Sequence, residues 1–142
     1  MLITNHVLQG AVVGTLAPGP VSAFVLGVAS HVAADSLPHW GDKPLDEVMH
    51  VAVADGLVGL GAMAWVLRVT PRARRQRVFA GMAGACLPDA DKPATVFFGV
   101  SPFPEAVDRF HAAIQRESQR RMPQEVLVAA LGALVVRRLS RR

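Results

Sequence analysis

The chain has no Asp, Glu, Lys or Arg between Met1 and Ala34, yet this apolar stretch contains two histidines, His6 and His31. Pro18-Gly19-Pro20 interrupts the stretch, which therefore predicts two apolar helices joined by a tight turn. Burying an imidazole is costly unless the ring is hydrogen-bonded, paired with a charge or bound to a metal. A fold built on these helices must therefore bring polar partners to both histidines.

Proline and glycine divide the rest of the chain into further segments of helical length. The breaks predict helices over residues 4–17, 21–36, 46–68, 71–87, 105–119 and 123–138. Residues 92–104 are expected to be irregular, and no segment has the alternation of a β-hairpin. The expected fold class is all-α, a compact up-down bundle of about five or six helices. Residues 1–142 form one domain, with the site motifs in residues 5–115 and a generic C-terminal helix at 123–138.

The histidines and aspartates lie at helix ends that alternate along the chain. Short connections make neighbouring helices antiparallel, so the end of one expected helix lies beside the start of the next. This order gathers at one end of the bundle His6, His31, Asp35, His39, Asp46, His50, Asp55, Asp89, Asp91 and His111. The arginine-rich connection over residues 68–77 is expected at the opposite end.

Imidazole and carboxylate groups together are the usual ligands of zinc and related divalent ions. His31 and Asp35 are four residues apart and share a helical face, so they can bind one ion; a local hydrogen-bonded pair is the alternative. Asp46 and His50 repeat this spacing, although Asp46 also suits a helix cap. The sequence predicts a divalent metal ion, zinc by preference. Its candidate ligands are His6, His31, Asp35, His39, His50, Asp89, Asp91 and His111.

Two carboxylates are candidates for the general base of a reaction. Asp55 precedes Gly56 inside an apolar helix, where capping does not explain an ionisable group. Asp89 belongs to the motif PDAD, which is either a turn or a pair of carboxylates able to bridge two ions. Asp55 and Asp89 are therefore the expected catalytic residues, and the pattern does not choose between them.

The composition favours a membrane location. Hydrophobic residues make up 51% of the chain and charged residues only 18%, below the quarter or so that is usual for a soluble domain. The mean hydropathy is +0.33. The apolar runs are short for full spans, so short tilted spans, a bundle lying partly in the bilayer and a soluble protein with an apolar core all stay open. The single cysteine, Cys86, excludes an internal disulfide.

The net charge of +4 is unevenly distributed. The positive charge gathers in two arginine clusters, Arg68, Arg72, Arg74, Arg75 and Arg77, and Arg137, Arg138, Arg141 and Arg142. Arginines beside apolar segments match the positive-inside pattern of membrane proteins. Neither cluster contains an aromatic residue, which argues against a nucleic-acid partner; a solvated basic loop is the alternative. The expected location is the bacterial inner membrane, with membrane lipid as the partner.

Several motifs together resemble those of a known family. They are Asn5-His6 with Gly10 and Gly14, the segment GVASHVAADSLPHW, the segment LPDADK and the late His111. In this order they resemble the bacterial and archaeal family of membrane-bound metal-dependent hydrolases, which is similar in motif order to zinc-dependent phospholipase C. The resemblance implies an all-helical fold. It also implies that His6, His31, Asp35, Asp89, Asp91 and His111 are at ligand positions, with His39, His50 and Asp55 as further candidates.

These observations predict a membrane-bound enzyme that uses a metal ion to hydrolyse a phosphoester, either a lipid head group or a periplasmic substrate. The metal would activate a water molecule and stabilise charge on the substrate oxygen. The alternative is a non-enzymatic membrane protein in which the same residues form a structural metal site. A structural zinc site is closed, whereas a catalytic one keeps an open position.

Overall fold

A computed structural model describes residues 1–41 and 43–141 of the chain. These residues form seven α-helices: α1 (Ile3–Leu16), α2 (Pro20–Asp35), α3 (Leu45–Val69), α4 (Arg75–Cys86), α5 (Asp91–Phe98), α6 (Glu105–Ile114) and α7 (Met122–Ser140). Short 3₁₀ turns cover Arg72–Arg74, Leu87–Ala90 and Gln119–Arg121. The prediction of an all-α fold is confirmed. Arg142, one of the C-terminal arginines, lies outside the described residues.

Local sequence explains where α2 and α3 begin. Helix α2 begins with Pro20, whose fixed φ angle suits the first helical position. The Ser22 hydroxyl accepts a hydrogen bond from the Gly19 N–H (3.2 Å) and so closes the first turn. Helix α3 follows Pro44, and Asp46 and Glu47 lie in its first turn, where negative charge is favourable.

The predicted irregular segment over residues 92–104 is wrong in its first part, because α5 occupies Asp91–Phe98. Pro93 lies in the first turn of this helix, where a missing N–H breaks no hydrogen bond. The helix ends only at Gly99, which has a φ of 75°. The helix predicted over residues 105–119 is also shorter, since α6 ends at Ile114.

The chain leaves α6 because its next residues pair with another segment. Strands β1 (Pro38–His39) and β2 (Arg116–Glu117) form a short parallel ladder, with Pro38 opposite Arg116. The Ser118 N–H extends the pairing with a hydrogen bond of 2.9 Å to the His39 carbonyl. This ladder ties the loop after α2 to the segment after α6.

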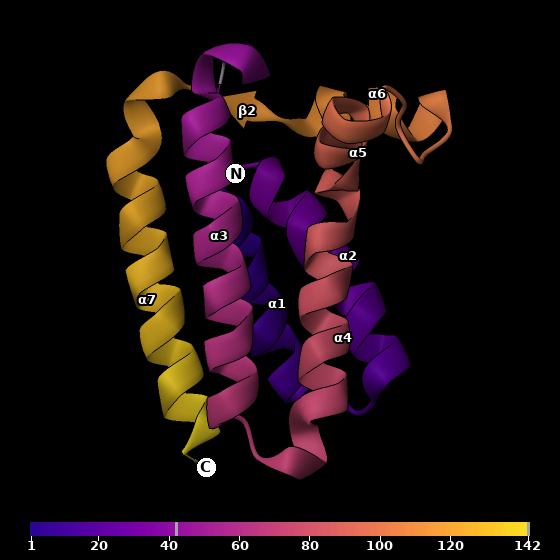
Figure 1. Cartoon of the computed structure of the whole chain (residues 1–142). Coiled ribbons are helices and arrows are strands. Elements are labelled where there is room, and N and C mark those ends of the chain that lie inside the picture. The colour runs from indigo at the N-terminus through magenta and orange to yellow at the C-terminus, as the bar shows by residue number, and fades with distance from the viewer. Residues whose placement is uncertain (42, 142) are drawn as a thin grey trace.

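The long helices run up and down, as the sequence predicts (Figure 1). The N-terminus, β2, α5 and α6 lie at one end of the bundle, and the α3–α4 connection and the C-terminus lie at the other. Arg77 donates a hydrogen bond of 2.9 Å to the carbonyl of Ala17, which follows α1. The arginine-rich connection therefore meets the end of α1 that is opposite to His6.

Helix α4 packs against α1 and α2 through glycines. A Cβ atom on Gly10 would lie 2.5 Å from the Gly81 carbonyl oxygen and 2.7 Å from Met82 Cα. A Cβ on Gly27 would also collide with the backbone at Gly81. Helices can approach this closely only where small residues face each other. The close approach holds α1, α2 and α4 together as the unit on which the site is built.

The core is small and the apolar surface is large. Val7, Leu8, Ala11, Val66, Val78, Met82 and Val136 form the buried cluster between α1, α3, α4 and α7. Many large apolar side chains are exposed on α2, α3, α5 and α7, including Phe24, Leu57, Leu60, Phe97, Phe98 and Leu131. Within the described residues, α3 alone is long and apolar enough to cross a membrane by length and composition.

Candidate metal centre

The first two helices bring three polar side chains together inside the bundle. His6 lies in the first turns of α1, and His31 and Asp35 lie in the last turns of α2. All three are fully buried. Asp35 Oδ1 is 3.2 Å from His6 Nε2, and Asp35 Oδ2 is 3.1 Å from His31 Nε2. The predicted spacing of His31 and Asp35 on one helical face thus places both groups at one centre.

Helices α5 and α6 close this centre from the end of the bundle. His111 on α6 places its Nε2 atom 3.0 Å from His31 Nε2 and 3.4 Å from Asp35 Oδ2. Asp89, in the turn before α5, places Oδ1 3.7 Å from His111 Nε2. Asp91 Oδ2 lies 3.9 Å from the other ring nitrogen, His111 Nδ1. We call the six residues His6, His31, Asp35, Asp89, Asp91 and His111 the His/Asp cluster.

A main-chain contact fixes which nitrogen of His31 faces the cluster. His31 Nδ1 lies 2.8 Å from the carbonyl oxygen of Ala85 on α4, so Nδ1 carries the proton and donates to it. In the neutral ring Nε2 is then left with a lone pair. A hydrogen bond of this kind on the far nitrogen is the usual support of a metal-binding histidine.

Charge within the cluster shifts the pKa values of two of its members. Contacts with Asp35 and Asp91 raise the pKa of His111 to about 9, because they favour the protonated ring more than burial disfavours it. For Asp91, burial raises the pKa, but contacts with His111 and Lys92 outweigh it and bring the pKa to about 2. Without a metal, a proton on His111 therefore offsets part of the negative charge of the aspartates.

Four of these residues can hold a metal ion. One ligand atom from each of His31, Asp35, Asp89 and His111 lies within 4.8 Å of the others. Ligand atoms about 2.1 Å from a tetrahedral ion are about 3.4 Å apart, close to the 3.0–3.7 Å between neighbouring ligand atoms here. The two carboxylates would neutralise a divalent ion, so the residues present fit such an ion in both geometry and charge.

Access to this group is from one side. The side chains of Asp89 and Asp91 are 18% and 16% exposed, whereas His31 and Asp35 are completely buried. The side chain of Gln115 reaches the same side, with its amide 3.0 Å from His111 Nε2. The partly exposed side of the centre is therefore the side of Asp89 and Asp91.

Other residues from the predicted site lie elsewhere. His39 is a buried residue of the β1–β2 ladder, where its Nδ1 donates to the Leu37 carbonyl (2.8 Å) and its Nε2 is 4.0 Å from Glu117 Oε1. His50 is exposed on α3, as is Asp46. None of these three belongs to the four-residue group described above.

Asp55 is engaged by the start of α1. Its carboxylate accepts hydrogen bonds from the N–H groups of Ile3 (2.6 Å) and Thr4 (3.2 Å) and from the Thr4 hydroxyl (2.6 Å). Asp55 thus caps α1 from a neighbouring helix. With both oxygens occupied in this way, Asp89 is the better placed of the two predicted general bases.

Glu125, a fully buried carboxylate at the start of α7, is not among the site residues that the sequence predicted. Its oxygens accept hydrogen bonds from the Leu2 N–H (3.0 Å), the Asn5 side-chain amide (2.7 Å) and the Trp40 N–H (3.2 Å). Glu125 thus holds the segment that precedes His6. The sequence feature that could have pointed to Glu125 is a single carboxylate at the start of an otherwise apolar helix.

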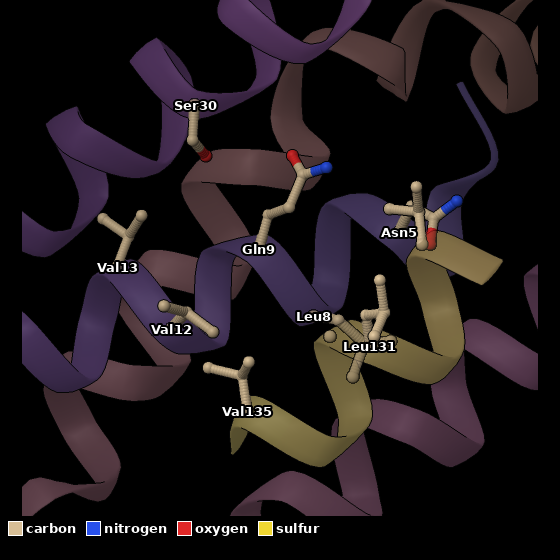
Figure 2. Close-up of a pocket in the computed structure, with 10 residues that line it drawn as sticks. Asn5, Leu8, Gln9, Val12, Val13, Ser30, Leu131 and Val135 are labelled. Carbon is tan, nitrogen blue, oxygen red and sulfur yellow. The ribbon is translucent and has the colours of Figure 1, made fainter. Parts of the chain in front are cut away.

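A separate apolar groove of about 420 Å³ runs between α1, α2 and α7. Leu8 and Val12 of α1 face Leu131 and Val135 of α7 along it, with Gln9 and Ser30 at its polar edge (Figure 2). The cluster residues do not line this groove. The groove therefore adds to the apolar surface of the bundle and is distinct from the candidate metal centre.

Comparison with known proteins gives no relative for this arrangement. No family model matches the chain, and no curated protein or solved structure is significantly similar to it.

Proposed function

We propose that this chain is a membrane-bound hydrolase that uses a divalent metal ion, zinc by preference, to cleave a phosphoester. The convergence of His31, His111, Asp35 and Asp89 on one point is the observation that carries the proposal. The resemblance of the sequence motifs to membrane-bound metal-dependent hydrolases supports it. A bound divalent ion would act as a Lewis acid and lower the pKa of a coordinated water molecule.

Residues of the chain would orient the ligands, accept a proton and exclude water. His31 is oriented by the Ala85 carbonyl, so its Nε2 lone pair is directed at the centre before any ion binds. Asp89, on the accessible side, is placed to accept a proton from a water molecule that enters there. The closed packing of α1, α2 and α4 excludes water from the far side of the centre.

The membrane location is part of the proposal. The apolar side chains exposed on several helices form a surface that is unusual for a soluble domain. Helix α3 has 25 residues and a mean hydropathy of 1.6 over its most apolar window, of which only 11% is buried. We place the bundle in the bacterial inner membrane, with the arginine-rich end in the cytoplasm. A lipid phosphoester or a periplasmic phosphoester would then reach the His/Asp cluster.

A non-enzymatic protein with a structural metal site is the second candidate. The complete burial of His6, His31 and Asp35 favours it, because structural zinc sites are closed. The partial exposure of Asp89 favours the enzyme. The two candidates share the metal centre and differ in whether one position of the ion stays open to a substrate, and hence in turnover.

Metal content and turnover, measured on the same samples, test the proposal. Wild-type protein purified in detergent should retain zinc and hydrolyse bis(p-nitrophenyl) phosphate or the phosphoester of phospholipid vesicles. His31→Ala should lose both properties, whereas His50→Ala, which changes an exposed histidine, should keep both. If zinc-loaded wild-type protein hydrolyses these substrates no faster than His31→Ala, the hydrolase is rejected and the structural site stands.

A further inference from the structure

Asp35 and Asp89 each direct their two carboxylate oxygens at different histidines. Asp35 Oδ2 lies beside His31 and His111, while Asp35 Oδ1 lies 3.2 Å from His6 Nε2. In the same way, Asp89 Oδ1 lies 3.7 Å from His111 Nε2, and Asp89 Oδ2 lies 3.7 Å from His6 Nε2. One oxygen of each aspartate thus serves the pair His31 and His111, and the other serves His6.

His6 has no hydrogen-bond partner for either ring nitrogen within the part of the chain that the structure describes. Its side chain is completely buried, and its 3.2 Å contact with Asp35 is not aligned as a hydrogen bond. A buried polar group without a partner is costly and calls for an explanation. The Nε2 atom lies within 3.7 Å of two carboxylate oxygens, which is the environment of a metal ligand.

The ring planes show that His6 and His31 cannot share an ion. A histidine binds a metal along the lone pair of its nitrogen, which lies in the ring plane. The His6 and His31 rings are stacked, with centroids 4.0 Å apart and planes inclined by only 22°, so the two planes have no point in common near both Nε2 atoms. The His31 and His111 rings are inclined by 53°, and their Nε2 atoms can converge on one ion.

We propose that the His/Asp cluster holds two divalent ions bridged by Asp35 and Asp89. One ion is bound by His31 and His111, and the second is bound by His6; each carboxylate gives one oxygen to each ion. Two nearly parallel rings whose centroids are 4.0 Å apart would hold their ions at a separation similar to the roughly 3.5–4 Å of two-metal hydrolases. The Met1 amino group pairs with Asp35 Oδ1 at 3.0 Å, so the second ion would have to replace this contact.

This inference rests on the metal centre of the proposed function and gives a physical reason for its substrate class. Two ions about 4 Å apart would stabilise the oxygen of the attacking water molecule and the leaving oxygen of the phosphate ester. The His/Asp cluster then suits the in-line hydrolysis of a phosphate ester, in which water attacks phosphorus and the alcohol leaves with the proton.

Metal counting tests the second site. Full-length protein in detergent, saturated with zinc and freed of excess ion, should contain two zinc ions per chain by mass spectrometry of the metal. His6→Gln should contain one, and His50→Ala should still contain two. One ion per wild-type chain, or two in His6→Gln, would overturn the inference.

A spectroscopic measurement on wild-type protein does not depend on the folding of any variant. With both positions filled by Mn²⁺, the paramagnetic resonance spectrum should show a spin-coupled pair, because the ions share two carboxylates. An uncoupled spectrum at full loading contradicts the proposal. A coupled pair without phosphoester turnover keeps the two-ion centre and rejects only the hydrolase.

Discussion

His111 is the member of the His/Asp cluster whose protonation should compete with metal binding. Its pKa is raised to about 9 by Asp35 and Asp91, so the ring is protonated at neutral pH when no metal is bound. A metal ligand must be deprotonated, so the ion has to displace this proton. Metal affinity should therefore fall by about tenfold for each pH unit below 9, as expected for one released proton.

Zinc affinity measured by chelator competition at pH 6.5, 7.5 and 8.5 checks this expectation. Asp91→Asn removes one of the contacts that raise the pKa of His111, so the zinc affinity of this variant should level off at a lower pH. Affinity that is constant across this range would show that His111 is not a ligand or that its pKa is ordinary.

Glu125 gives a second prediction for a single residue. Its carboxylate accepts three N–H donors in a fully buried position. Glu125→Gln replaces one carboxylate oxygen with an NH2 group, which would face an N–H donor instead of accepting from it. We expect a loss of about 2 kcal/mol in the free energy of unfolding. Thermal unfolding should show a clear decrease in midpoint. The control is Glu47→Gln, which changes an exposed carboxylate and should leave the midpoint unchanged; equal effects would contradict the role of Glu125.

The glycines of α4 carry a prediction about helix packing. A Cβ on Gly81 would collide with the backbone of α1 at Gly10 and would lie 2.9 Å from Gly14 Cα. Gly81→Ala should therefore separate α4 from α1, lower the unfolding midpoint and weaken metal retention, because the Ala85 carbonyl orients His31. Gly56→Ala is the matched control, since a Cβ there meets nothing within 4 Å. By helix propensity it should stabilise α3 by up to about 1 kcal/mol.

The order of the helices could be predicted from the sequence, and with it the main part of the site. Apolar segments and proline breaks determine α1 to α4 and α7, and their alternation brings His6 close to both His31 and Asp89. The β1–β2 ladder could not be predicted, because it pairs two residues with two others far along the chain. Local patterns also gave no sign that α5 would form around Pro93.

Roles that depend on contacts between distant segments were not predictable. Asp55 is a lone carboxylate in an apolar helix, and the pattern alone suggested a catalytic group. In the structure its oxygens accept hydrogen bonds from the start of α1. Glu125 received no role for the same reason, because its partners Leu2 and Trp40 lie more than 80 residues away. Periodicity places a residue on a helix but does not identify its partner.

At the scale of the whole molecule, the exposed apolar surface predicts how the protein fractionates. It should sediment with membranes and resist extraction by high salt, because salt screens the arginines but does not weaken apolar insertion. Detergent should release it. Release by salt alone, or recovery as a monomer without detergent, would show that the apolar side chains are covered in another way.

The last prediction concerns orientation across the membrane. Short loops rich in arginine stay on the cytoplasmic side, so the α3–α4 connection should face the cytoplasm and the His/Asp cluster the periplasm. Helix α7, with Arg137 and Arg138 in its last turn, ends at the same end of the bundle as that connection (Figure 1), so both basic segments favour one orientation. After Cys86→Ala removes the native thiol, Lys43→Cys should react with an impermeant thiol reagent in intact cells. Arg72→Cys should react only after lysis.

Neutral residues at Arg68, Arg72, Arg74, Arg75 and Arg77 should mix the two orientations, while His31→Ala should leave the orientation intact and remove the metal. Labelling of Arg72→Cys from outside, with Lys43→Cys protected, would reverse the assignment and give the centre a cytosolic substrate.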